Sequence, residues 1–297
     1  MNLRRVIAGA ALVLLLSFGA AFGQADLKTG KGAHEPARAG RFRVTLTGFT
    51  VDKQTADNIL ETDGKGDEVY ILADVAQYDS YHYRFTSPRY EGNPYVSFVM
   101  GDMLNGRGNL TSRRSLASVL MGYDNYQDGP PRVRAGSAGD LGGLRTGDRF
   151  PTNEPWLMTG NPSESRLPLL LWEGELRKDQ DLVIIIPTVW EWDGGNPQLR
   201  ARFTEYVDGY FRDRTYHNLP FPLLDFIGGD AFGAGDRPVG MKAGHGWDVH
   251  GLAVNFDNAL WAASASPARL GTGVLSMNYH RPGEESYTLY FKVERLK

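Results

Sequence analysis

The sequence predicts an all-β fold, and three observations lead to that prediction. Five segments carry strand patterns, because their apolar residues alternate with polar ones or form short continuous runs. Only one long segment has apolar residues at helical spacing. The chain also contains 36 glycines and 16 prolines, residues that the turns between strands need. A β-rich protein with little helix is therefore expected.

Residues 1–25 have the layout of a secretory signal peptide. Arg4 and Arg5 precede an apolar run, and small residues that suit a signal peptidase follow around Ala21–Ala25. An uncleaved anchor is the alternative, since about 18 apolar residues can just span a bilayer. We expect cleavage, because no basic cluster follows the run at once. The mature protein is then secreted or periplasmic and has no integral membrane segment.

The composition excludes several classes of protein. The chain has no cysteine, so disulfide scaffolds, zinc ribbons and thiol enzymes are ruled out. Its 32 basic and 35 acidic residues give a net charge of −3, which argues against a general electrostatic grip on nucleic acid. An exported chain without disulfides must rely on its core, or on its core and a bound ion.

The expected strands follow a flexible lead-in, residues 26–40, and belong to one domain over residues 41–297. Two early segments alternate apolar and polar residues, and a third such segment closes the chain. Two central segments are continuous apolar runs, which predicts strands buried on both faces. In chain order the five segments are Arg41–Phe49, Asp67–Val75, Leu167–Leu176, Leu182–Trp190 and Ser286–Arg295.

One amphipathic helix is expected over Asn196–Arg214. Asn196 can cap its N-terminus and Pro197 occupies the favoured first position. An aromatic stripe at helical spacing, which includes Phe203 and Tyr210, predicts a face packed on the sheet. A shorter helix is also considered around Ser115–Met121.

A long irregular insertion is expected at about 84–165. This stretch is dense in Gly, Pro, Asn and Arg, and irregular segments of such length are usually functional or mobile. Its GGLRTGD sequence is echoed by GGDAFGAGD from Gly228 onwards. Two matches of this kind arise easily in a glycine-rich chain, so they do not indicate a repeat.

The stretch Leu60–Ile71 is the strongest candidate for a functional site. Glu61, Asp63 and Asp67 crowd a glycine-containing turn that leads directly into a strand. Carboxylates packed so closely repel one another unless a cation neutralises them, and an oxygen-rich turn suits Ca²⁺. The alternative is a solvated turn in which Asp and Gly supply only turn geometry.

This stretch resembles the first calcium loop of C2 domains, which are Ca²⁺-dependent β-sandwiches. Glu61, Gly64 and Asp67 fall in register with the acid, glycine and acid of that loop, and Tyr70 follows. A C2 domain also carries an acid-x-acid pair after a later apolar strand, and Glu191-Trp192-Asp193 has that pattern here. The GDEVY turn, the GGLRTGDRFP stretch and the closing YTLYFKVER also resemble uncharacterised exported bacterial proteins, to which no activity is attached.

The C2 resemblance implies a C2-like antiparallel β-sandwich that binds Ca²⁺ at one end. The implied metal ligands are Glu61, Asp63, Asp67, Glu191 and Asp193. The glycine-rich insertion would then account for the long separation between the two acidic loops.

Other residues are candidates for catalysis or binding. Glu173 lies on an expected strand, and His245, Asp248 and His250 lie in a glycine-containing stretch, so a hydrolase acting on glycans could be built from these four. No GxSxG nucleophile turn, phosphate-binding loop or dinucleotide motif is present. The tyrosines and tryptophans could stack on sugars, although sheet packing explains most of them.

Three functions are therefore considered. The first is an exported, non-enzymatic β-sandwich that binds Ca²⁺ and contacts a protein, a glycan or a membrane surface. The second is an exported hydrolase with a site built from loops, and the third is a structural protein of the cell envelope without a ligand.

Overall fold

The computed structural model describes residues 38–55, 66–67, 69–85, 96–99, 103–117, 143–159, 166–191, 207, 237–240, 250–280, 283 and 285–297. Residues Ala37–Lys297 form one compact unit. The predicted leader and nearly all of the lead-in lie outside the described residues. No helix of the described residues is long and apolar enough to cross a membrane.

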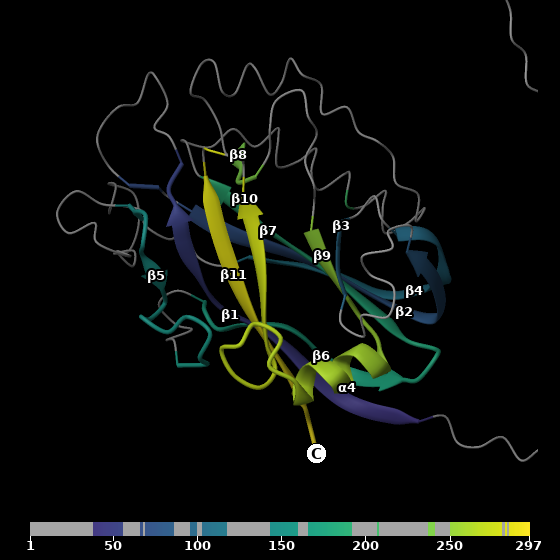
Figure 1. The fold of residues 1–297 in the computed structure, drawn as a ribbon. Coiled ribbons are helices and arrows are strands. Elements are labelled where there is room, and N and C mark those ends of the chain that lie inside the picture. Colours follow the sequence, from purple (N-terminus) through teal and green to yellow (C-terminus); the bar gives the residue numbers. More distant parts are fainter. Residues whose placement is uncertain are drawn as a thin grey trace, which may run out of the picture. The chain divides into compact units, whose positions relative to one another are not determined.

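The fold is an all-β sandwich of two antiparallel sheets with one helix (Figure 1). The first sheet contains β1 (Ala39–Lys53), β5 (Arg149–Phe150), β6 (Leu169–Arg177), β10 (Val274–His280) and β11 (Ser286–Arg295). The second sheet contains β2 (Val69–Phe85), β3 (Val96–Val99), β4 (Met103–Ala117), β7 (Leu182–Glu191), β8 (Arg237–Pro238) and β9 (His250–Val254). The helix is α4 (Phe256–Ser264).

Each sheet is built around one central strand. In the first sheet, the strand order is β10-β11-β1-β5, and β6 also pairs with β1. In the second sheet, the order is β3-β9-β7-β2-β4, and β8 also pairs with β7. Strands β1 and β7 therefore each carry a short extra strand, and both short strands follow a Gly-Asp pair in the sequence.

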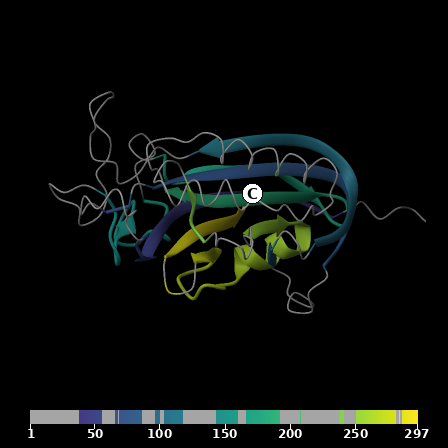
Figure 2. The same cartoon turned by 90° about the horizontal axis from the view of Figure 1, so that it is seen from above.

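The inner faces of the two sheets form the core (Figure 2). Phe42, Val44 and Leu46 of β1 point inward as their alternation predicts. The inner faces of β2 and β11 were also predicted, and their residues Val69, Ile71, Ala73, Val75, Tyr287, Leu289, Phe291 and Val293 all belong to the core. Burying one such large apolar side chain contributes about 1.5–3 kcal/mol.

Strand β7 is buried along its whole length, as its continuous apolar run predicts. Val183 and Ile185 belong to the inner core, whereas Ile184 and Ile186 are buried on the opposite face. The same prediction for β6 is wrong, because Leu170 is 46% exposed and Glu173 is half-buried. The apolar run alone does not distinguish a strand covered on one face from a strand covered on both.

Several expected elements require correction. Residues 84–165 are not irregular throughout, because they contain β3, β4 and β5, and β4 pairs with β2 as far as Phe85. Ser115–Ala117 end β4, which contradicts a helix that starts at Ser115, and residues 118–121 lie outside the described residues. The predicted helix Asn196–Arg214 lies outside the described residues except for Val207, which is helical and buried.

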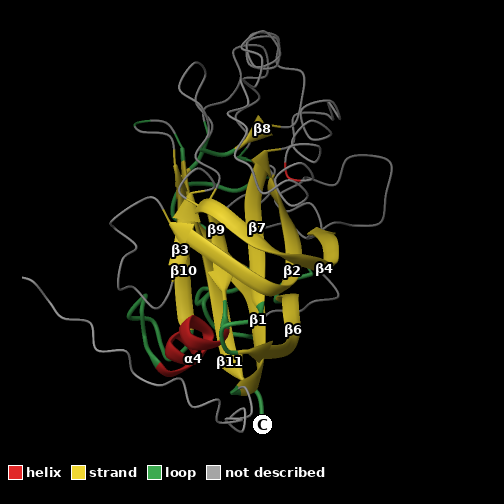
Figure 3. Cartoon of the chain, turned by 90° about the vertical axis from the view of Figure 1, so that its right-hand side faces the viewer, coloured by secondary structure: helices red, strands yellow, loops and turns green. Residues whose placement is uncertain are grey.

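Helix α4 was not predicted from the sequence. Asn255 caps it, and the side chains of Asn255 and Asn258 each accept a hydrogen bond from the other residue's backbone N–H. Phe256, at its first turn, meets Phe42 edge to face with the ring centroids 6.0 Å apart. The helix lies at the end of the sheets opposite β8 (Figures 1 and 3).

A turn at residues 143–148 forms backbone hydrogen bonds both with the end of β1 and with the residues just before β2. Asp67 and Leu144 exchange two backbone hydrogen bonds of 2.8 Å, and Gly147 N donates to Val51 O at 2.8 Å. Gly66 and Gly143 lie so close that a Cβ atom on Gly143 would be 2.0 Å from Gly66 O. Gly143 also has a φ of +78°, which other residues rarely adopt. Gly66 and Gly143 therefore permit this close backbone contact.

We predict that Gly143→Ala destabilises the protein by roughly 3 kcal/mol or more, because it combines a backbone clash with an unfavourable φ. Gly147→Ala is the matched control: its φ is +93°, but a Cβ atom there meets nothing within 4 Å. The control should lose only about 1–2 kcal/mol. Chemical denaturation of both variants measures the difference, and equal losses would contradict the close contact between the two segments.

Candidate functional site

Two of the five predicted metal ligands meet at the β8 end of the sandwich. Glu191 is the last residue of β7, and Asp67 lies two residues before β2. Strands β2 and β7 are antiparallel with Val69 opposite Glu191, so this pairing brings the two acids together although they are far apart in the sequence. Asp67 and Glu191 are only 4% and 6% exposed. Glu61, Asp63 and Asp193 lie outside the described residues.

Thr55, which follows β1, lies between the two acids. Its hydroxyl oxygen is 2.9 Å from Asp67 Oδ1 and within hydrogen-bond distance of Glu191 Oε1. Its backbone N–H donates to Asp67 Oδ2 at 2.7 Å. Thr55 is itself buried, so water does not take its place as a partner of either acid.

Tyr287 of β11 completes the cluster from the first sheet. Its hydroxyl donates a short hydrogen bond to Asp67 Oδ2, and its ring is fully buried in the core. We call Thr55, Asp67, Glu191 and Tyr287 the acid cluster. Thr55 follows β1 and Tyr287 lies in β11, both of the first sheet, whereas Asp67 precedes β2 and Glu191 ends β7, both of the second. The acid cluster thus connects the sheets by side-chain hydrogen bonds.

Strand β8 and the two residues after it form hydrogen bonds beside Glu191 and β11. Arg237 pairs with Glu191 in the β-ladder, and Val239 N donates to Val189 O at 2.9 Å. Gly240 N then donates to Glu285 Oε1 at 2.9 Å, just before β11. The turn at residues 143–148 therefore lies beside the backbone of Asp67, and β8 lies beside the backbone of Glu191.

The environment favours the neutral form of Asp67. Burial raises the pKa of Asp67 to about 7, because it penalises the charged carboxylate, and the negative charge of Glu191 acts in the same direction. The hydrogen bonds from Tyr287 and Thr55 oppose this shift only in part. Burial, followed by the charge of Asp67, raises the pKa of Tyr287 well above its ordinary value, so this hydroxyl keeps its proton and donates.

The acidic side chains of the described residues do not form a metal site by themselves. A carboxylate has about four acceptor positions, and hydrogen bonds from Thr55 and Tyr287 occupy three of those on Asp67. Ca²⁺ takes six to eight oxygen ligands, whereas no three His, Asp or Glu side chains of the described residues lie close enough to hold a metal ion together. Calcium binding through Glu61, Asp63, Asp67, Glu191 and Asp193 stays a prediction, because three of these acids lie outside the described residues.

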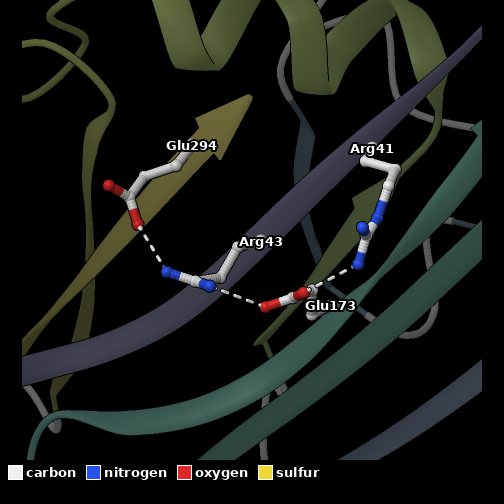
Figure 4. A network of polar contacts seen from close by, with 4 residues as sticks. All are labelled: Arg41, Arg43, Glu173 and Glu294. Atoms are coloured by element: carbon white, nitrogen blue, oxygen red, sulfur yellow. Dashed lines mark hydrogen bonds and ion pairs between the residues drawn. The ribbon is translucent and has the colours of Figure 1, made fainter. Parts of the chain in front are cut away.

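The candidate residues for hydrolysis are not gathered in the described structure. Figure 4 shows Glu173 between Arg41 and Arg43, with contacts of 3.0 and 2.8 Å, and Arg43 also faces Glu294 at 3.9 Å. This network lies across β6, β1 and β11 of the first sheet, and such half-exposed ion pairs are typical of a solvated sheet face. His250 begins β9 of the second sheet, and His245 and Asp248 lie outside the described residues.

Sequence reasoning missed Thr55 and Tyr287. Tyr287 was assigned to the inner face of a strand from its alternation, which is correct, but alternation does not reveal that its hydroxyl reaches a carboxylate. Thr55 carried no motif at all. A signal did exist in general terms: a buried acid needs donors, and the buried hydroxyl residues near the ends of neighbouring strands are the groups that can supply them.

We predict that Thr55→Val destabilises the protein by about 2 kcal/mol, because valine has the same shape but leaves two buried carboxyl groups without the hydroxyl between them. Thr55→Ser is the matched control: it keeps the hydroxyl, loses one methyl group and should cost about 1 kcal/mol or less. Urea denaturation at one pH measures both variants. A valine variant as stable as the wild type would show that the hydroxyl makes no important contact.

No family model, no curated protein and no solved structure matches this chain.

Proposed function

We propose that the protein is an exported, non-enzymatic β-sandwich that binds a macromolecular partner through the end of the sheets that holds the acid cluster. One observation carries the proposal: the described residues that flank three long segments of the chain meet at this end. These segments are residues 56–65, 118–142 and 192–236, and they are 10, 25 and 45 residues long.

The first segment starts and finishes within the acid cluster. Thr55 precedes residues 56–65 and Gly66-Asp67 follow them, and the hydrogen bonds between Thr55 and Asp67 hold the two ends together. The segment contains Glu61 and Asp63, so the hydrogen bonds of the acid cluster hold both ends of the acidic stretch found in the sequence.

The two ends of the third segment are also held next to each other. Glu191 precedes residues 192–236 and Arg237 follows them, and these two residues are paired in the β-ladder of the second sheet. A 45-residue stretch therefore leaves the sheet and returns to the adjacent position.

The second segment connects the same region to the edge of the second sheet. Ala117 precedes residues 118–142 and is paired with Leu72 near the start of β2. The residues that follow it, Gly143 and Leu144, lie against Gly66 and Asp67. All three segments are thus attached where β1, β2 and β7 are held together.

Long segments carried by a rigid scaffold are the usual location of binding residues. The alternative hydrolase is less well supported, since Glu173 is engaged by Arg41 and Arg43 on the first sheet. A protein or glycan partner that contacts several segments at once agrees best with this arrangement.

Photo-cross-linking in cells that export the protein tests the proposal. A cross-linking amino acid replaces Asp63, Gln127 or His217, one in each segment, or Ser276, which is exposed on the first sheet and serves as the control. We expect the same partner to be captured from at least two segments and not from Ser276. Capture from Ser276 alone would place the binding surface on the sheet and contradict the proposal.

A further inference from the structure

Strand β10 forms one edge of the first sheet, and its backbone is directed outward at two positions. Its register with β11 is regular over Val274–His280. In an antiparallel pair, successive residues point their backbone N–H and C=O groups alternately toward the neighbouring strand and away from it. Gly273 O accepts a hydrogen bond from Val293 N, so the alternation directs the backbone groups of Ser276 and Asn278 away from β11.

No described element pairs with β10 on the side away from β11. Ser276 and Asn278 are exposed, and no hydrogen bond joins their outward backbone groups to any part of the described chain. The Asn278 side chain does not cover the edge, because its amide donates toward β11, to Thr288 Oγ1 at 3.0 Å and to Asp52 Oδ2 at 3.1 Å. Two N–H groups and two C=O groups are therefore available to a further strand.

The other edge strands of the described sheets are protected, whereas β10 is not. β6 carries Glu173 and Glu175, and β4 carries Arg113 and Arg114 and shifts its register against β2. β3, β5 and β8 have four residues or fewer. Charged side chains, irregular pairing and short strands are the usual means by which a sheet edge avoids another strand. The sequence of β10, VLSMNYH, has no proline, no acidic residue and no lysine or arginine.

We propose that β10 binds an extended segment of a partner protein, which joins the first sheet as a further strand beside Leu275–Tyr279. In this mode of recognition the backbone of the partner supplies affinity, and alternate side chains supply specificity. The inference is independent of the proposed function, because it concerns a second surface. A protein that is cross-linked at Ser276 and differs from the partner of the three long segments agrees with both proposals.

The chain itself fills both ends of the open edge. At one end, Ala268 N donates to Val274 O at 3.3 Å. At the other end, Gly240 lies beside the backbone of His280, because a Cβ atom on Gly240 would be 3.2 Å from His280 N. The open stretch is thus limited to Leu275–Tyr279, and its length fits a short extended segment.

The filled ends argue against a second copy of the chain as the occupant. Two β10 strands paired about a twofold axis at Met277 would place Val274 of each copy opposite His280 of the other. The turn beside Val274 would then collide with the residues beside His280, since both already occupy the edge. An extended segment without such flanking residues avoids this collision.

The side chains of β10 define the kind of segment that fits. Residues directly opposite each other on paired strands lie on the same face of a sheet. Met277 is buried and belongs to the core, so the partner residue opposite it should be apolar. Ser276 and Asn278 are exposed, so the partner residues opposite them should be polar. The expected occupant is therefore a segment in which polar and apolar residues alternate.

An NMR titration of the exported protein with the pentapeptide acetyl-TTVTT-amide tests the proposal, because its valine fits opposite Met277. The amide signals of Ser276 and Asn278 should shift, and at saturation their hydrogen exchange should slow by at least about tenfold. The amides of Leu275 and Met277 are internal references, because they face β11 and their exchange should not change. The control is the same peptide N-methylated at the two threonines beside the valine, which lacks the N–H groups that face β10 and should not bind.

The variants Ser276→Pro and Ser276→Ala test the same contact from the side of the protein. The Ser276 N–H points away from β11, so proline removes the outward donor and leaves the hydrogen bonds between β10 and β11 in place. Proline should abolish the slowing of exchange at Asn278 by the peptide, whereas alanine, which retains the N–H, should preserve it. The N-methylated peptide makes the corresponding test without altering the fold.

Three results would overturn the inference. The first is a titration in which the peptide shifts neither the Ser276 nor the Asn278 amide. The second is equal binding of the N-methylated peptide, since the contact would then not use the backbone of β10. The third is protection of these two amides that rises with protein concentration in the absence of peptide, which would assign the edge to a second copy of the chain.

Discussion

One threonine hydroxyl lies between two buried carboxyl groups, and the β8 end of the sandwich is organised around that contact. Thr55 and Tyr287 approach the contact from the first sheet, just after β1 and within β11, and Asp67 and Glu191 approach it from the second, just before β2 and at the end of β7. Burying two acids is unfavourable unless hydrogen bonds compensate, so the position of each donor is tightly constrained. The glycine turn at residues 143–148 and the short strand β8 hold the backbones of the two acids in place.

The two ends of the sandwich are closed by different physical interactions. At one end, α4 packs Phe256 against Phe42, and this apolar contact does not change with pH. At the other end, the side-chain hydrogen bonds of the acid cluster connect the two sheets. The long segments at residues 56–65, 118–142 and 192–236 are attached at this polar end. The protein therefore combines an apolar end with a polar end, and the proposed binding surface lies at the polar end.

Sequence periodicity predicted β1, β2, β7 and β11, because strands with a well-formed inner face show it as alternation or as a continuous apolar run. It did not predict β4, since MLNGRGNLTSRRSLA shows no clear alternation of apolar and polar residues and becomes a strand through its pairing with β2. The C2 resemblance implied that Asp67 and Glu191 lie at one end of the sandwich, and the pairing of β2 with β7 brings them together there. Tyr287, which donates to Asp67, is 220 residues away in the sequence, and only the tertiary fold brings its hydroxyl to the carboxylate.

The central claim is that burial in the acid cluster, together with the charge of Glu191, raises the pKa of Asp67 to about 7 in the folded protein. Its most direct test is an NMR titration of the wild type, in which the side-chain carboxyl carbon of Asp67 is followed from about pH 3 to about pH 9. The account predicts a titration with its midpoint at about 7. A midpoint near the ordinary value of 3.8 would show that Asp67 is ionised at neutral pH and would contradict the account.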